Sequence, residues 1–281
     1  MSIVLVFGAT GSVGRFLLPL LLPQHQVIAV SRSLPSDKAG WINGDLNDPR
    51  RAWPAVDTAI SLGPLDAFAA WLQRYPATSL RRVIALSSMS VESKRESMDP
   101  LERALAMRLL AAESSVMGIA VERGIACTLF RPTLIYGAGT DRSLAPIARF
   151  ARRWRMLPVP FGASGLRQPV HARDLAAACV AALEKTDTFG KIYALGGGER
   201  LRFDTLLLRL RAAQPGFVLP VPVPMMALRL ATLLRRGLFS KTAIARLRQP
   251  LIADNGEAIR DFGYAPAAFI ANDVLPIGKN I

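Results

Sequence analysis

Short runs of aliphatic and β-branched residues alternate with longer stretches of helical periodicity through the first half of the chain. The short runs predict strands at Ser2–Phe7, Gln26–Val30, Thr58–Ser61, Arg82–Ser87 and Ala126–Phe130. Strands that alternate with helices are typical of the α/β class, because right-handed crossovers assemble them into one parallel sheet. We therefore predict a doubly wound parallel sheet.

Two helices can be delimited from the residues at their ends. Periodicity indicates a helix over Ser12–Leu22, which Pro19 should kink or end because proline lacks the backbone N–H. A long helix is expected from about Pro100 to Arg123, closed by Gly124 just before the next strand.

A glycine-rich turn joins the first strand to the first helix, which is the context that a phosphate-binding turn requires. Gly8 permits a tight turn, Gly11 lets backbone N–H groups approach a pyrophosphate, and Gly14 lets the helix pack closely on the sheet. The alternative is a simple strand-to-helix turn. The candidate cofactor residues in this turn are Gly8, Thr10, Gly11, Ser12, Val13 and Gly14.

The end of the second strand distinguishes NADP from NAD. An NAD-selective site places a carboxylate there for the ribose hydroxyls, but this stretch holds only Ser31, Arg32 and Ser33. Arg32 would pair with a 2′-phosphate while a neighbouring serine added a hydrogen bond, which favours NADP and leaves NAD open. Alternatively, Arg32 is a solvated surface charge.

The second half has a different texture, with turns rich in glycine and proline. We predict a Rossmann-type dinucleotide-binding domain over residues 1–160, with residues 170–196 returning to its sheet. Residues 197–281 are expected to form mainly a smaller C-terminal substrate lobe.

The composition fits a soluble protein with a full hydrophobic core, since 51% of the 281 residues are hydrophobic. No apolar stretch reaches the ~20 residues that span a bilayer, so we expect no transmembrane segment, and the lack of a basic leader predicts a cytoplasmic location. Cys127 and Cys179 lie in apolar segments and predict buried thiols and no metal site. The sequence leaves open whether the protein forms a homodimer.

The net charge of +14 suggests a polyanionic partner. However, the charges appear along the whole chain in short clusters, with no recognisable nucleic-acid module. We expect a dispersed basic surface and no specific nucleic-acid partner. The stretches Met225–Arg236 and Lys241–Arg248 mix leucine with arginine, and we expect core on one side and water on the other, with a membrane surface or a partner as the alternative.

Several motifs resemble those of extended, atypical short-chain dehydrogenases/reductases of the NAD-dependent epimerase/dehydratase family. Gly8–Gly14 is similar to the family's GxxGxxG, Gly44–Leu46 to its GDL, and Arg131–Gly137 to its RPxxxYG. Arg167–Ala176 resembles its segment with valine-histidine and Asp-Leu-Ala, and Asp254–Pro266 its closing stretch.

The resemblance implies further cofactor contacts. Asp45 and Leu46 would bracket the adenine, and Leu62 and Gly63 would line the cofactor beyond the fourth strand. Pro132 would lie near the nicotinamide.

The resemblance also implies catalytic candidates. Ser88 takes the position of the family's catalytic Ser or Thr and would hold a substrate oxygen, and Tyr136 would lie near the nicotinamide. Lys94 is a candidate to replace the lysine that the family uses on its long helix and that this chain lacks there, if the loop that holds Lys94 folds inward. The alternative is that this loop is solvated. Asp174 is expected to cap a helix.

The family's acid/base pair is missing. Members that transfer hydride use a Tyr followed four residues later by a Lys on the long helix. Counting forward from Val91 and back from Glu113 places Leu105 and Leu109 there. The residues four positions after the chain's tyrosines are Ser79, Thr140, Gly197 and Ala268.

Two functional hypotheses follow. The first is an NADP-dependent oxidoreductase or epimerase acting on a sugar-like or other carbonyl substrate. A nucleotide-sugar would be one such substrate, and the resemblance implies basic residues to hold its diphosphate. The candidates for holding this diphosphate are Arg142, Arg149, Arg152, Arg153 and Arg167, with a solvated helix face as the other interpretation.

The alternative hypothesis is a non-catalytic NADPH-binding sensor or accessory subunit.

Overall fold

The computed structural model describes residues 1–32, 40–76, 78–137, 139, 141, 143–224, 226 and 246–275. Its centre is a parallel sheet with the order β11-β6-β5-β4-β1-β2-β3, which confirms the predicted Rossmann-type architecture. The strands are β1 (Ile3–Phe7), β2 (Gln26–Ser31), β3 (Trp41–Asn43), β4 (Thr58–Ser61), β5 (Arg82–Leu86), β6 (Ala126–Pro132) and β11 (Lys191–Leu195).

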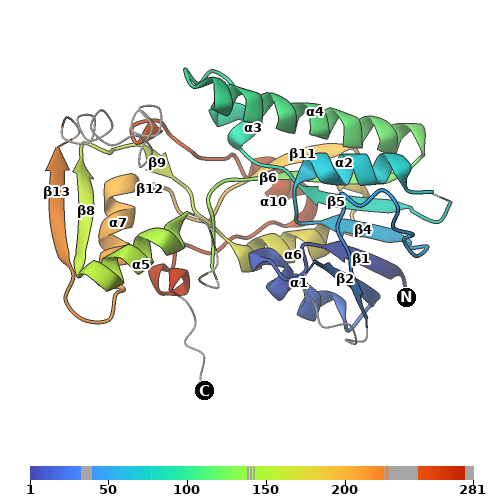
Figure 1. Cartoon of the computed structure of the whole chain (residues 1–281), viewed down its shortest axis with the longest axis horizontal. Coiled ribbons are helices and arrows are strands. Elements are labelled where there is room, and N and C mark those ends of the chain that lie inside the picture. The colour runs from blue at the N-terminus through green and yellow to red at the C-terminus, as the bar shows by residue number, and fades with distance from the viewer. Residues whose placement is uncertain are drawn as a thin grey trace.

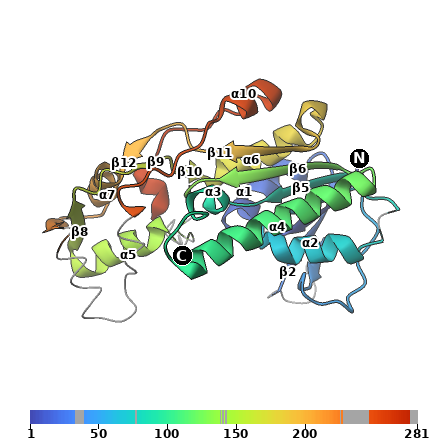
Figure 2. The same cartoon turned by 90° about the horizontal axis from the view of Figure 1, so that it is seen from above.

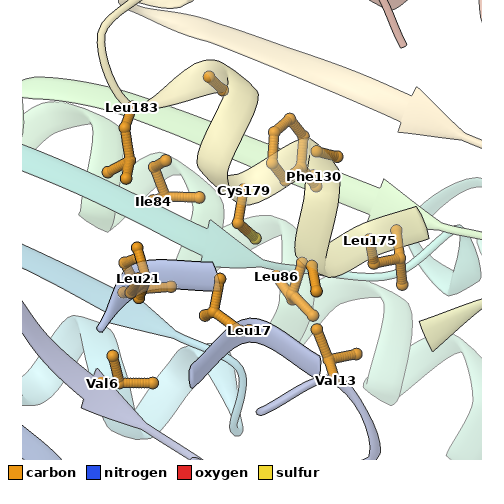
Figure 3. Packing of buried hydrophobic residues seen from close by; sticks show 14 of the residues in the cluster. Val6, Val13, Leu17, Leu21, Ile84, Leu86, Phe130, Leu175, Cys179 and Leu183 are labelled. Atoms are coloured by element: carbon orange, nitrogen blue, oxygen red, sulfur yellow. The ribbon is translucent and has the colours of Figure 1, made fainter. Parts of the chain in front are cut away.

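Helices cover both faces of this sheet (Figures 1 and 2). On one face, α1 (Ser12–Leu21) packs against α6 (Ala172–Ala182), and their leucines meet side chains of the central strands (Figure 3). On the other face, α2 (Leu65–Arg74) packs against α4 (Pro100–Glu122). The short α3 (Ser90–Ser93) contacts α4. Each face therefore buries its own apolar layer.

Two expectations about the helices can be compared with the structure. Pro19 lies inside α1, which continues to Leu21, one residue short of the predicted end at Leu22. The long helix α4 could cross a membrane by length and composition alone. In the fold it packs on α2, α3 and β6, and its Glu113 is buried and ion-paired.

A smaller lobe lies beyond the sheet and has a core of its own (Figure 1). Its helices are α5 (Leu144–Trp154), α7 (Phe203–Ala212) and the 3₁₀ helix η2 (Ala271–Val274). Its strand pairs are β7 (Ile135–Tyr136) with β10 (Val170–His171), β8 (Met156–Phe161) with β13 (Leu219–Pro224), and β9 (Leu166–Arg167) with β12 (Leu201–Arg202).

The lobe begins earlier in the chain than the predicted boundary near residue 160. Both α5 and β8 pack against α7, and β8 pairs along its length with β13. The prolines of β8 and β13 recur at every second position, so the intervening residues keep the N–H groups that a ladder needs. Residues 144–161 therefore belong to the smaller lobe.

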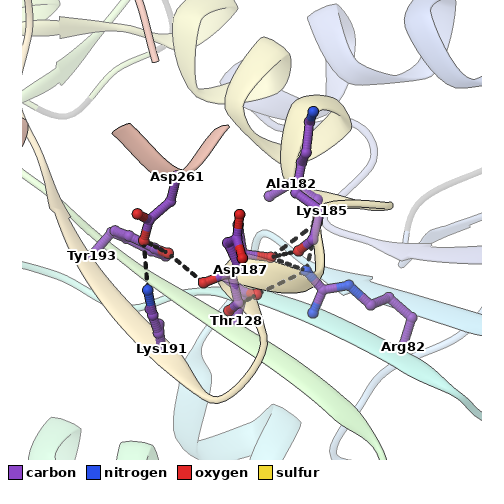
Figure 4. Close-up of polar contacts among 9 residues, drawn as sticks. Arg82, Thr128, Ala182, Lys185, Asp187, Lys191, Tyr193 and Asp261 are labelled. Atoms are coloured by element: carbon purple, nitrogen blue, oxygen red, sulfur yellow. Dashed lines mark hydrogen bonds and ion pairs between the residues drawn. The ribbon is translucent and has the colours of Figure 1, made fainter. Parts of the chain in front are cut away.

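Polar contacts hold α6 and α10 against the strands of the sheet (Figure 4). Arg82 donates to the carbonyl oxygen of Ala182 at 2.7 Å and to the hydroxyl of Thr128 at 2.7 Å, which ties the end of α6 to β5 and β6. Burial lowers the pKa of Arg82 to about 10. Asp261, on α10 (Gly256–Phe262), accepts hydrogen bonds from Lys191 and Tyr193 of β11. The 3₁₀ helix η1 (Thr186–Thr188) lies between α6 and β11.

Candidate functional site

The carboxyl ends of β1, β2, β3 and β4 surround a cavity of about 440 Å³. In a parallel sheet these ends lie at one edge, so loops that are far apart in the sequence meet there. Asn47, which the sequence analysis missed, also lines the cavity two residues after Asp45. The predicted cofactor residues that line it are Gly8, Thr10, Gly11, Ser31, Arg32, Asp45, Leu46, Leu62 and Gly63.

The turn after β1 has the geometry of an anion cradle. Gly8 has φ of 76°, and its carbonyl oxygen accepts a hydrogen bond from the N–H of Gly11 at 2.9 Å. A Cβ on Gly14 would lie 2.4 Å from the carbonyl oxygen of Ala9, so only glycine fits where α1 meets β1. The N-cap residue of α1 is Gly11, which has no side chain to cap the helix and which lines the cavity, so the amino terminus of α1 begins at the cavity edge.

The predicted first-turn residues divide by role. Ser12 begins α1, whereas the side chain of Val13 is buried in the core between α1 and α6. Val13 could therefore meet a cofactor only through its backbone N–H. Pro132 does not line this cavity. It ends β6, where its carbonyl oxygen accepts a hydrogen bond from the N–H of Met89 at 3.1 Å.

The segments after β2 and β3 supply the polar side chains of the cavity. Ser31 is buried at the end of β2, and Arg32 follows it as an exposed residue. Ser33 lies outside the described residues. The carboxylate of Asp45 accepts hydrogen bonds from the backbone and side-chain nitrogens of Asn47 at 2.9 and 3.0 Å, which shapes the turn after β3.

Two of the three catalytic candidates lie close together in the chain, on and beside α3. Ser88 follows β5, is half-buried, and accepts a hydrogen bond from the N–H of Ser90 at 3.1 Å. Lys94 ends α3 and is also half-buried. Burial lowers the pKa of Lys94, and the positive charge of Arg246 lowers it further.

Tyr136 lies elsewhere, in the core of the smaller lobe. Its ring packs edge-on against His171 and Phe269, and its hydroxyl accepts a hydrogen bond from the N–H of Ile270 at 3.0 Å. Burial raises the pKa of Tyr136 to about 12. This placement gives Tyr136 a structural use, and its side chain has no exposed surface to offer a substrate.

The hydroxyls of the other three tyrosines also form hydrogen bonds within the protein. All are buried, and each hydroxyl donates a hydrogen bond within the protein. Burial is the first cause that raises the pKa of both Tyr193 and Tyr264. The partners are the carbonyl oxygen of Pro54 for Tyr75, the carboxylate of Asp261 for Tyr193 and the carbonyl oxygen of Gly196 for Tyr264.

A buried carboxylate underlies the candidate catalytic segment. Glu113 of α4 accepts hydrogen bonds from the hydroxyl of Ser87 at 2.5 Å and from Arg131 at 2.6 and 2.9 Å. Arg131 also reaches Glu92 of α3 at 2.9 Å. These contacts raise the pKa of Arg131 and join β5, β6, α3 and α4 beside Ser88. Sequence analysis used Glu113 only as a counting mark and missed this network.

A larger cavity of about 680 Å³ adjoins the segment after α3. Arginine and glutamate side chains line it, including Arg95, Glu96 and Arg246. Arg167 also lines it but is buried, and its guanidinium donates to the carbonyl oxygens of Gln249 and Arg246. That use is structural, so Arg167 does not fit the expected role of a free diphosphate ligand.

The remaining basic candidates are exposed. Arg149, Arg152 and Arg153 lie on the solvent side of α5, which fits the solvated-face interpretation, and Arg142 lies outside the described residues. No group of three His, Cys, Asp or Glu side chains able to hold a metal ion occurs within the described part of the chain.

The expected capping role of Asp174 is wrong. The side chain of His171 caps α6, accepting a hydrogen bond from the N–H of Arg173 at 3.0 Å. Asp174 lies in the first turn and instead accepts a hydrogen bond from the N–H of Ala267 at 3.0 Å. It thereby holds the C-terminal segment against the junction between the two regions.

Solved structures share this fold across almost the whole chain. The UDP-glucuronic acid 4-epimerase from Bacillus cereus in complex with NAD is 16% identical, with a TM-score of 0.72, over 97% of this chain and 94% of that one. A short-chain dehydrogenase/reductase superfamily protein from Agrobacterium tumefaciens with bound NAD is 17% identical, with a TM-score of 0.69 and the same shares.

Curated relatives match a shorter stretch. The mitochondrial NADH dehydrogenase [ubiquinone] 1 alpha subcomplex subunit 9 of Arabidopsis thaliana is 39% identical over 88 residues, which are 31% of this chain and 21% of the relative. The subunit of the same name from Dictyostelium discoideum is 31% identical over 81 residues, 29% of this chain and 22% of the relative. The chain therefore matches about a fifth of the length of these relatives.

Residues 63–196 match the model of the NAD dependent epimerase/dehydratase family. This stretch begins just after β4, ends just after β11 and contains Ser88, Glu113 and Arg131. The middle of the chain therefore resembles this family, and the fold of almost the whole chain is that of the solved structures above.

Proposed function

We propose that the chain is an NADP(H)-binding protein that holds the dinucleotide without the family's tyrosine-based hydride transfer, as a sensor or an accessory subunit. The observation that carries the binding proposal is the single cavity in which the turn after β1 meets the ends of β2, β3 and β4. Gly8 has a positive φ, and a Cβ there would lie 3.2 Å from the backbone of Leu62, so the turn can approach the segment after β4 this closely because it has glycine at this position.

The preference for NADP rests on the end of β2. Arg32 is exposed at the cavity and Ser31 precedes it, whereas no Asp or Glu occurs from Gln26 to Arg32. A guanidinium forms charge-assisted, bidentate hydrogen bonds with a phosphate, and the end of β2 itself supplies no carboxylate to repel that phosphate.

The non-catalytic role rests on the tyrosines and on α4. All four tyrosine hydroxyls form hydrogen bonds inside the protein. We assign Leu105 and Leu109 of α4 to the positions of the family's tyrosine and lysine, and leucine cannot transfer a proton. The curated relatives, named as subunits of a larger enzyme, support an accessory role.

A binding titration tests the cofactor proposal. NADPH should bind more tightly than NADH, and Arg32→Gln should weaken NADPH by about tenfold or more while leaving NADH almost unchanged. Arg81→Gln, an exposed arginine at the start of β5, is the matched control and should change neither affinity. Equal affinities that Arg32→Gln does not alter would contradict the NADP preference, and failure to bind either dinucleotide would contradict the proposal as a whole.

A second candidate function is an NADP-dependent oxidoreductase or epimerase on a sugar-like carbonyl substrate, with Ser88 holding the substrate oxygen. The observation in its favour is the larger cavity beside α3, lined by Arg95 and Arg246. Turnover of a nucleotide-sugar or small carbonyl that Ser88→Ala abolishes would establish this function and remove the accessory role. Activity that appears only in the double variant Leu105→Tyr with Leu109→Lys would instead support the natural protein as a binder.

A further inference from the structure

Two stretches of the sequence combine many basic residues with no acidic ones. Residues 142–173 and 205–253 contain 15 Lys and Arg and no Asp or Glu. The remaining residues contain the other 20 Lys and Arg and all 21 Asp and Glu, so they are nearly neutral. The first stretch includes α5 and β8 of the smaller lobe.

Helix α5 presents part of this charge together with large aromatic side chains. Its solvent side carries Arg149, Phe150, Arg153 and Trp154, which recur at the three- and four-residue spacing of one helix face. Trp154 is 60% exposed. The guanidinium of Arg153 lies 5.7 Å from the centre of the Trp154 ring, and the Phe150 and Trp154 rings are 6.4 Å apart.

The starts of β8 and β13 extend this surface. Met156 of β8 pairs with Leu219 of β13, and both side chains are exposed. The N–H of Leu219 donates to the carbonyl oxygen of Arg155 at 2.9 Å, which fixes the two segments side by side. Phe217, just before β13, is 72% exposed. Figure 1 shows α5, β8 and β13 at the end of the molecule away from the seven-stranded sheet.

We call these exposed side chains at the end of the smaller lobe the aromatic–arginine patch. It contains Phe150, Trp154, Met156, Phe217 and Leu219, with Arg149, Arg152, Arg153 and Arg155.

We propose that the aromatic–arginine patch docks the protein on a membrane surface that contains anionic lipid. Such a surface offers negative headgroups to the arginines and an acyl boundary to the aromatic and aliphatic side chains. None of the four arginines pairs with a carboxylate of the described residues, so their charge is available to an external anion.

The apolar members decide between partners of the same charge. A nucleic acid would satisfy the arginines and stack on the aromatic rings, but it would leave Met156 and Leu219 in water. A bilayer interface accepts all three kinds of side chain at once. Exposed aliphatic and aromatic groups beside unpaired arginines are therefore better explained by a lipid surface than by a nucleic acid.

Vesicle sedimentation with the full chain tests the proposal. The protein should bind phosphatidylcholine vesicles that contain about 30% phosphatidylglycerol and should not bind pure phosphatidylcholine. The triple variant Arg149→Gln, Arg152→Gln, Arg153→Gln should weaken binding about a hundredfold, since each arginine near such a surface contributes about fivefold. The charge-matched control Arg81→Gln, Arg103→Gln, Arg260→Gln removes three exposed arginines from outside the patch and should leave binding within about twofold of wild type.

The aromatic part of the patch has its own readout. Trp154 is the only exposed residue among the four tryptophans, so its fluorescence should shift to shorter wavelength on anionic vesicles. The shift should disappear in Trp154→Phe, whose binding persists, and Phe217→Ala should weaken binding while Leu101→Ala, at an exposed leucine of α4, should not.

Three results would overturn the proposal: no binding to anionic vesicles, an equal loss in the patch and control triple variants, or binding without any shift of Trp154 fluorescence. Binding of single-stranded RNA or polyglutamate that depends on Arg149, Arg152 and Arg153, in a protein that ignores vesicles, would assign the patch to a different class of partner. None of these outcomes depends on dinucleotide binding.

Discussion

The dinucleotide-binding region and the smaller lobe differ in where their large aromatic side chains lie. In the first, they are buried, as where Trp71 stacks on Phe68 and Tyr75. The smaller lobe also buries aromatic rings in its core, but its Trp154 and Phe217 face solvent near arginines that pair with no carboxylate of the described residues. Burial of an aromatic side chain stabilises the fold, whereas its exposure leaves binding surface available to another molecule. The comparison separates the part of the chain that specifies the fold from the part that supplies a docking surface.

The largest expected effect on stability comes from replacing one tryptophan by alanine in each of the two regions. Trp71→Ala should reduce the free energy of unfolding by about 3–5 kcal/mol, because Trp71 is 1% exposed and its removal leaves a cavity. Trp154→Ala should change it by less than about 0.5 kcal/mol. Urea unfolding monitored by circular dichroism measures both, and comparable losses would break the distinction between the regions.

The glycine cradle is the next target. Gly14→Ala should destabilise the protein by about 1–3 kcal/mol and reduce NADPH affinity, because the new Cβ meets the backbone of Ala9. Gly118→Ala in α4 is the matched control, since a Cβ there meets nothing within 4 Å. It should stabilise the protein by about 0.5–1 kcal/mol through helix propensity, with unchanged NADPH affinity. Wild-type stability and affinity in Gly14→Ala would show that α1 need not approach β1 this closely.

A smaller effect concerns His171, at the junction of the two regions. Its Nδ1 accepts a hydrogen bond from Arg173 only when that nitrogen is unprotonated, and burial lowers the pKa of His171 below its ordinary 6.5. The unfolded chain therefore binds the proton more readily, so stability should fall as the pH drops below about 6.5. His171→Asn, which can still cap α6, should flatten this dependence between about pH 5 and 7. An unchanged slope in the variant would assign the pH dependence to other groups.

The sequence predicts the strands of the large sheet well and the elements of the smaller lobe poorly. β-branched runs placed β1, β2, β4, β5 and β6 to within two residues of their observed ends, because buried parallel strands are continuous apolar segments. The sequence also identifies Gly8, Thr10, Gly11 and Arg32, which line the cavity, because they follow directly from the local motif after β1 and the end of β2. These features depend on residues that are close together in the chain.

The missed features depend on contacts across the fold. Alternating prolines in β8 and β13 suggested loops, since proline normally disrupts a ladder, and only their mutual pairing makes them strands. The hydroxyl of Tyr136 lies beside Ile270, more than a hundred residues away in the sequence, and nothing local predicts that contact. His171 caps α6 in place of the expected Asp174, whose carboxylate instead accepts a hydrogen bond from the N–H of the distant Ala267.

Hydrogen exchange with and without NADPH tests most directly whether the cavity at the ends of β1 to β4 holds NADP(H). We expect slower exchange at residues 8–14, 30–32, 44–47 and 62–64, with little change at residues 92–98 and 246–251, which line the larger cavity. Protection confined to the larger cavity, or none at the glycine turn under saturating NADPH, would contradict this expectation.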